Sequence, residues 1–228
     1  RNMDLVLSFN NSANLLTDAR QIIDKTKELA FRSVNVAMLQ RNWYLGKRIS
    51  EEILQGEDRA EYGSQVILQL SKELTEIYGK GFTKSYLYNF VRFYKTFPNI
   101  FQSPIGQSKL LSWTHYNLLL DVSNDEARAW YADEAYREGW SVRTMQRNIS
   151  SQYYQRMLLS QHKEGVREEM KQLTAPMQTD KLEFIKNPVV AEFLGLAPNS
   201  DLYESKLESA IIAHIQKFVM ELGKGYAF

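Results

Sequence analysis

A proline-free segment from about residue 12 to residue 54 constrains the fold more than any other part of this chain. Its apolar residues recur at spacings of three and four, which is the period of an amphipathic helix. We expect one long helix or two collinear helices here, with Gly46 as a point of bending. A periodic segment of this length commonly packs against a partner helix or runs the length of a bundle.

The same helical period returns along most of the chain and predicts a mainly α fold. The expected later helices cover residues 63–78, 84–97, 112–120, 125–137, 142–159, 162–173 and 203–222. Residue types that begin and end helices lie at their boundaries. Thr83 is placed to accept a backbone N–H at the start of one helix, and Ser141 is placed to do so at the start of another. Gly139 is expected to end the helix before Ser141.

A glycine-rich turn at residues 79–82 separates two of these helices. The helix after the turn has one polar face and one apolar face, and no acidic residue occurs between residues 77 and 120. The apolar face is expected to bury Leu87, Phe90, Val91, Tyr94 and Phe97. The polar face carries Ser85, Tyr88, Asn89, Arg92, Lys95 and Thr96. A helix, a short turn and a second helix with a basic outer face predict a DNA-binding helix-turn-helix at about residues 64–97. The alternative is an amphipathic helix whose polar side faces only water.

A second basic face is predicted on the helix over residues 142–159. Its outer side carries Arg143 and Arg147, and no acid occurs between residues 139 and 163. Residues 79–160 hold 10 basic and 6 acidic side chains, although the net charge of the whole chain is only +1. A local positive surface of this kind suits contact with phosphates. The alternative is that the arginines form salt bridges with Glu126, Asp133, Glu134 or Glu138.

Double-stranded DNA is therefore the predicted partner. The residues expected to contact it are Lys80, Lys84, Tyr88, Asn89, Arg92, Lys95, Arg143 and Arg147. Tyr88 and Asn89 would lie nearest the base edges, and the basic residues would bind phosphates. The alternative from another class is a protein-interaction module, which would form a homodimer or bind a partner helix through the long N-terminal helix.

Composition excludes several kinds of chemistry. The chain has no cysteine, which excludes disulfides, zinc–thiolate sites and cysteine nucleophiles. His115 has no second histidine near it and no nucleophile at a suitable spacing, so we expect a structural or capping role for it. The 4 tryptophans are expected to anchor the core. No apolar run is long enough to span a bilayer and no signal peptide is visible, so we expect a cytoplasmic protein without a membrane partner.

Distinctive runs occur in order along most of the chain. They are WYLGKRI at 43–49, GKGF at 79–82, FY at 93–94, FP at 97–98, LSWTHY at 111–116, ARAWY at 127–131, WSVRTMQRNI at 140–149, EFLGL at 192–196, LESA at 207–210 and ELGKGYAF at 221–228. These runs resemble the YhcG-like proteins, which join an N-terminal domain of unknown function to a C-terminal PD-(D/E)XK nuclease domain. The resemblance implies a helical DNA-binding domain, a metal-dependent endonuclease behind it, and an association with bacterial restriction or defence.

The resemblance and a composition shift after residue 180 together divide the chain into three parts. We expect a helical DNA-binding domain at residues 1–160, a linker at 161–180 and the start of an α/β PD-(D/E)XK domain at 181–228. The strands that would carry the Asp and Glu-x-Lys ligands of Mg²⁺ are expected to follow Phe228. Only Glu208 matches a family position near the metal. We therefore expect this chain to hold no cofactor and to leave DNA uncut, whereas the complete nuclease would use Mg²⁺.

Overall fold

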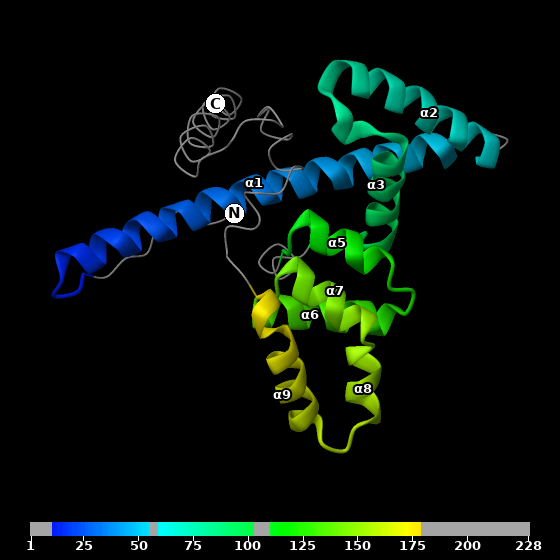
Figure 1. Ribbon diagram of the computed structural model, residues 1–228. Helices are drawn as coiled ribbons and strands as arrows, with labels where there is room; N and C mark the ends of the chain where they lie inside the picture. Colours follow the sequence, from blue (N-terminus) through cyan, green and yellow to red (C-terminus); the bar gives the residue numbers. More distant parts are fainter. Residues whose placement is uncertain (1–10, 55–58, 103–109, 179–228) are drawn as a thin grey trace. The chain divides into compact units, whose positions relative to one another are not determined.

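The computed structural model describes residues 11–54, 59–102 and 110–178, and these segments are helical and contain no strand (Figure 1). The elements are α1 (Leu15–Leu54), α2 (Arg59–Tyr78), the 3-10 helix η1 (Lys80–Phe82), α3 (Lys84–Thr96), α5 (Trp113–Leu120), α6 (Asp125–Glu138), α7 (Val142–Ser150), α8 (Tyr153–Leu159), α9 (Lys163–Thr174) and the 3-10 helix η2 (Ala175–Met177). The prediction of a mainly α fold is confirmed. The chain divides into two compact units, Arg1–Ala37 with Asn187–Phe228, and Met38–Lys186. The predicted start of a nuclease domain lies outside the described residues.

Helix α1 confirms the long helix expected from the first periodic segment. Asn14 precedes it, and its side-chain oxygen accepts the backbone N–H of Thr17 at 3.1 Å, which satisfies a free donor of the first turn. Gly46 lies in the buried part of the helix. A Cβ atom at this position would lie 1.9 Å from the carbonyl oxygen of Phe90. Gly46 therefore permits close backbone contact with α3, which is a different role from the bend that was expected.

Helices α2 and α3 are joined by η1 in a helix, short turn and helix arrangement. Gly79 has a φ of 94°, a conformation that favours glycine, and it follows the last residue of α2. A Cβ atom at Gly63 of α2 would meet the side chain of Ile53 of α1 at 3.0 Å, so these two helices pack closely. Thr83 stands at the N-cap of α3, but its side chain makes no capping hydrogen bond. The predicted role of the Thr83 hydroxyl is therefore wrong.

An aromatic core joins α3 to α5. The rings of Phe90 and Phe93 lie 5.4 and 5.3 Å from the ring of Trp113, and all three side chains are almost fully buried. Aromatic pairs at such separations contribute about 0.5–1.5 kcal/mol each beyond the burial of their area. Trp43 of α1 is also buried, and its indole N–H donates to the carbonyl of Phe97 at 3.0 Å. The expected anchoring role of Trp43 and Trp113 is confirmed.

The helix expected over residues 142–159 is in fact two helices, α7 and α8. Gln152 between them has a φ of 54°, which a right-handed helix does not allow. Tyr131 of α6 satisfies both broken ends, because its hydroxyl donates to the carbonyl of Asn148 at 3.3 Å and accepts the backbone N–H of Tyr154 at 3.0 Å. Burial raises the pKa of the Tyr131 hydroxyl, so it stays protonated and able to donate.

Helix α9 confirms the helix expected at residues 162–173, and it returns alongside α8 (Figure 1). Arg156 of α8 donates to a carboxylate oxygen of Glu169 at 2.6 Å, and Met170 is buried between the helices. Apolar burial and a partly exposed ion pair thus hold α9 on α8.

Residues after α9 are hydrogen-bonded to the start of α7. The hydroxyl of Ser141 donates to the carbonyl of Met177 at 2.8 Å. The side-chain oxygen of Gln178 accepts the backbone N–H of Ser141 at 3.3 Å and the hydroxyl of Thr144 at 2.9 Å. Much of the segment assigned to a linker at 161–180 is thus packed on the helical unit, and the division into domains stays a prediction.

No helix in the described part of the chain is both long enough and apolar enough to cross a membrane.

Candidate nucleic-acid interface

The outer face of α3 carries most of the residues predicted to contact DNA. The opposite face is fixed by burial of Leu87, Phe90, Val91 and Phe93. This burial leaves Lys84, Tyr88, Arg92 and Lys95 exposed, with Asn89 half-buried beside them. Lys80 is exposed on η1, immediately before the helix. The structure therefore presents the predicted side chains of α3 to solvent.

Two pairs on this face are in contact. The ammonium of Lys84 lies 5.8 Å from the centre of the Tyr88 ring, within the range of a cation–π interaction. The side-chain oxygen of Asn89 accepts a hydrogen bond from Nη1 of Arg92 at 3.3 Å. The two residues of each pair lie four or three positions apart, about one turn of the helix, as expected for neighbours on a helical surface.

The guanidinium of Arg92 is engaged by the end of α5. Its Nη2 donates to the carbonyl of Leu120 at 2.7 Å and to Oδ1 of Asp121 at 2.9 Å. The side chain of Arg92 is 47% exposed, so it lies at the surface while making these bonds. A phosphate contact by Arg92 stays a prediction, and in the free protein its donors are largely used internally.

Helix α7 carries the second predicted basic face. Ser141 caps the helix by accepting the backbone N–H of Thr144 at 3.0 Å. Thr144, Met145 and Asn148 are buried on the inner side. Arg143 and Arg147 are consequently exposed on the outer side.

Three of the acids considered as alternative partners for these arginines are engaged by other groups. The pairs are Glu134 with Arg137, Glu138 with Lys171 at 3.2 Å, and Glu126 with the hydroxyl of Tyr154 at 3.4 Å. Among the residues that the structure describes, no ion pair joins Arg143 or Arg147 to an acid. Both guanidinium groups thus present their charge to solvent in this part of the chain.

The two basic helices have a common neighbour in α5. Helix α3 packs on α5 through the aromatic core, and α7 also contacts α5. All three helices belong to one compact unit. Since α3 and α7 both pack on α5, the direction in which each basic face points depends on how its helix is held against α5.

His115 is a buried structural residue of α5, as expected. Its Nε2 donates to the carbonyl of Trp140 at 2.9 Å, since a carbonyl can only accept. Its Nδ1 is then the acceptor for the hydroxyl of Ser112 at 2.6 Å. Burial lowers the pKa of the imidazole and outweighs the effect of the backbone hydrogen bonds. The ring is therefore neutral and joins the start of α5 to the turn before α7.

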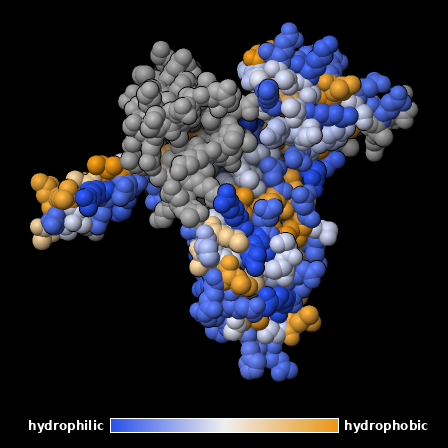
Figure 2. All heavy atoms as spheres, viewed as in Figure 1, coloured by the Kyte–Doolittle hydropathy of each residue, from blue (hydrophilic) through white to orange (hydrophobic). Residues whose placement is uncertain are grey.

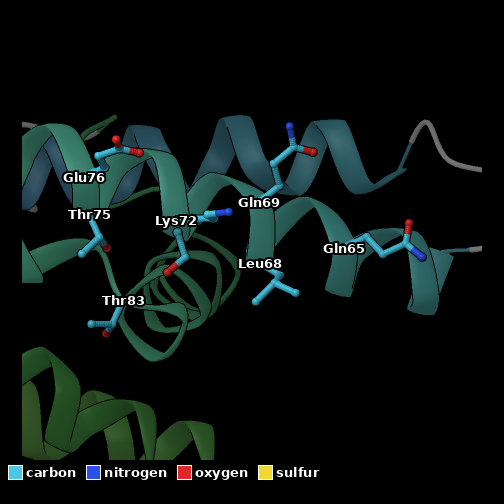
Figure 3. Close-up of a pocket in the computed structure, with 8 residues that line it drawn as sticks. Gln65, Leu68, Gln69, Lys72, Thr75, Glu76 and Thr83 are labelled. Atoms are coloured by element: carbon cyan, nitrogen blue, oxygen red, sulfur yellow. The ribbon is translucent and has the colours of Figure 1, made fainter.

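An open groove of about 890 Å³ lies along the outer side of α2 (Figure 3). It is lined by Gln65, Leu68, Gln69, Ser71, Lys72, Thr75, Glu76 and Thr83. Leu68 is 60% exposed in it. The lining combines Leu68 with amide and hydroxyl side chains and with Lys72 and Glu76, which lie four residues apart on α2.

No metal centre is formed within residues 11–54, 59–102 and 110–178, where no group of three His, Asp or Glu side chains is placed to hold an ion. Glu208, the residue matched to a family position near the metal, lies outside the described residues. Its role stays a prediction.

Two residues that shape the candidate interface were not found from the sequence. Asp121 follows α5 and bonds Arg92, and Arg128 of α6 donates to carbonyls at the same helix end. No local sequence pattern marks either residue, because Asp121 lies 29 positions from Arg92 and Arg128 lies 9 positions from Leu119. An acid directly after a helix and an arginine within one are common on solvated surfaces.

Comparison with known proteins shows the family to which this chain belongs. A family model described as the DUF1016 N-terminal domain matches residues 18–156, so the chain belongs to this family, and the YhcG-like resemblance is confirmed. A curated relative named "Putative nuclease YhcG", from Escherichia coli (strain K12), is 35% identical over 237 aligned residues. The alignment covers 91% of this chain and 62% of that relative, so the chain spans less than two thirds of the relative's length. No solved structure matches the chain significantly.

Proposed function

We propose that this chain is the DNA-binding region of a metal-dependent DNA endonuclease. The observation that carries the proposal is the outer face of α7, where Arg143 and Arg147 are exposed and form no ion pair with any described acid. Unneutralised arginines on a well-packed helix supply the sequence-independent attraction on which duplex binding depends. The name of the relative from Escherichia coli supports a nuclease setting.

In this proposal, docking on the duplex is electrostatic. The helix-turn-helix formed by α2, η1 and α3 places α3 in or near the major groove, with Tyr88 and Asn89 nearest the base edges. Lys80, Lys84 and Lys95 bind phosphates beside α3. Helix α7 supports the complex through Arg143 and Arg147 on the backbone.

Cleavage belongs to the complete protein. Carboxylates of a PD-(D/E)XK domain would hold Mg²⁺, which polarises the phosphate and activates water. Glu208 is the one residue of this chain proposed to lie near that site. The chain itself would bind duplex DNA without cutting it, and a role in restriction or defence would belong to the whole protein.

A second candidate function is a protein-interaction module built on the start of α1. Leu15, Leu16 and Ile23 are 84%, 62% and 51% exposed there, and Figure 2 shows hydrophobic patches at this end of α1. Exposed apolar side chains at helical spacing favour docking of a partner helix or a second copy of the chain.

One experiment separates the two functions. A variant with Lys84→Gln and Lys95→Gln, and a second with Leu15→Ser and Ile23→Ser, are compared with the wild type for duplex binding and for molecular mass in solution. The DNA-binding proposal predicts weaker binding by the lysine variant only, with a salt slope reduced by about two. Loss of a dimer in the apolar variant, with duplex binding absent in every protein, would favour the interaction module.

A further inference from the structure

The C-terminal end of α5 is capped by two arginines from two other helices. The last carbonyls of a helix have no partner within it, and the helix dipole makes this end negative. Arg92 of α3 donates to the carbonyl of Leu120 at 2.7 Å. Arg128 of α6 donates to the carbonyl of Leu119 at 3.2 Å and to that of Val122 at 2.5 Å. Three charge-assisted hydrogen bonds thus join α3 and α6 to the same helix end.

The two caps differ in exposure. The side chain of Arg128 is 15% exposed and also pairs with Asp125 of its own helix at 2.6 Å. The side chain of Arg92 is 47% exposed, and its acidic partner Asp121 is 75% exposed. Arg128 therefore lies mostly in the interior, where α6 meets the end of α5. Arg92 and Asp121 lie at the surface, where α3 meets the same helix end.

We propose that Arg92 and Asp121 are positioning residues for duplex DNA, which hold the α3 face in its binding orientation instead of contacting the phosphates. This inference rests on the proposed function. Both hydrogens of the Arg92 Nη2 are used by the α5 end, and an Nη1 hydrogen is used by Asn89. A bidentate grip on a phosphate would have to break these bonds and would leave the Asp121 carboxylate close to the DNA.

Arg92 also orients Asn89. A guanidinium can only donate, so the side-chain oxygen of Asn89 faces Arg92 and its amide N–H groups are left for a ligand. The face beside it is then rich in donors, from Asn89, Lys84 and Lys95. Such a face is complementary to phosphate oxygens and to the acceptor edge of guanine, and less so to adenine, which an asparagine reads with donor and acceptor together.

The two readings of Arg92 predict opposite effects of Asp121→Ala. If Arg92 contacts phosphate, removal of Asp121 frees the guanidinium and removes a repelling charge, so the affinity for DNA rises. If Arg92 and Asp121 position α3, the same change weakens binding although it makes the protein more positive. We expect a loss of about three- to tenfold for Asp121→Ala and for Arg92→Ala, with neither lowering the salt slope by the unit expected of a lost phosphate contact.

The experiment measures binding of the full chain to a random-sequence duplex over a range of salt, for Arg92→Ala, Asp121→Ala and the double variant. If Arg92 and Asp121 act as one unit, the double variant should bind DNA no more weakly than the single variant with the lower affinity. Asp121→Asn keeps an oxygen acceptor for Arg92 and should restore most of the affinity. Arg156→Ala, which removes the similar contact with Glu169 between α8 and α9, is the matched control and should leave binding unchanged.

Thermal unfolding by circular dichroism shows that each variant retains its fold before binding is compared. Tighter binding by Asp121→Ala, or a salt slope reduced by about one in Arg92→Ala, would overturn the positioning role while leaving DNA binding in place. Absence of binding by the wild type at low salt would instead overturn the proposed function, and the positioning role with it.

Discussion

Gly46 is a residue of α1 at which an added side chain has no room. The nearest atoms to a Cβ at this position would be the carbonyl oxygen and carbon of Phe90, at 1.9 and 2.5 Å. These are backbone atoms of a packed helix, so they cannot move as the end of a flexible side chain can. Contact between α1 and α3 therefore requires glycine here.

We predict that Gly46→Ala lowers the free energy of unfolding by about 1–3 kcal/mol, the usual cost of overpacking. Urea unfolding followed by circular dichroism measures it. Gly165→Ala is the matched control, because Gly165 lies in α9 with no heavy atom within 4 Å of the added Cβ. That control should be neutral or stabilising by up to about 1 kcal/mol. Equal stability of the two variants would contradict the close contact.

His115 makes the stability of the fold depend on pH. Burial holds its pKa below the ordinary value of 6.5 in the folded protein, whereas the unfolded chain takes up a proton near 6.5. Its contribution to stability is therefore fully present above pH 6.5 and is lost as the pH falls towards the lower pKa of the folded state.

We predict that the stability advantage of the wild type over His115→Gln shrinks between about pH 7.5 and about pH 5.5. Glutamine can still donate to the carbonyl of Trp140 but does not titrate. Urea unfolding of both proteins at the two pH values gives the difference, in which the acids common to both proteins cancel. A difference that stays constant with pH would mean that His115 titrates normally.

At the scale of single residues, the sequence predicted whether a residue is buried or structural better than it predicted which residues are in contact. Repeated spacing predicted burial of Leu87 and Phe90, and the absence of any plausible nucleophile predicted a structural His115. The burial of Phe93 was missed, because it lies beside the apolar stripe and is covered by Trp113 from a helix further along the chain. The contact between Arg92 and Asp121 was missed for the same reason, since local pattern carries no information on which helices meet.

Helix α7 is the element on which the DNA-binding account depends most. Its inner face is packed and its outer face carries two exposed arginines, so both charges can change without loss of core contacts. Each phosphate contact contributes about 0.9 to the slope of the logarithm of affinity against the logarithm of salt concentration.

We therefore predict that Arg143→Gln combined with Arg147→Gln weakens duplex binding and reduces the magnitude of that slope by about two. Fluorescence anisotropy over a salt series measures both quantities. Lys163→Gln on α9 is the control, because Lys163 is an exposed cation on a helix that is assigned no DNA contact. Loss of affinity with an unchanged slope would mean that the two arginines do not contact phosphates, and an unchanged affinity would remove α7 from the interface.

At the scale of elements, periodicity and end signals predicted most helices of the described residues to within a few residues. They did not predict the break between α7 and α8, because the sequence there has no proline or glycine. The break is stabilised by Tyr131, whose hydroxyl bonds both free backbone groups from α6. An interruption that depends on a residue in another helix cannot be recognised from local sequence.

At the scale of the whole molecule, the helical architecture and the family could be predicted, and membership is established by the match over residues 18–156. The boundaries between domains could not be predicted from the sequence in the same way. Residues 177 and 178 were assigned to a linker on composition, yet they bond Ser141 at the start of α7. Polar composition describes solvent exposure, and it does not exclude a packed segment held by hydrogen bonds.

The central claim is that this chain binds duplex DNA through its own basic faces. Its most direct test is the anisotropy of a labelled random-sequence duplex titrated with the chain at about 50 mM and about 200 mM salt. The account predicts micromolar binding at the lower concentration and a loss of at least about tenfold at the higher one. Absence of binding at the lower concentration would contradict the account and leave the apolar start of α1 as the stronger basis for function.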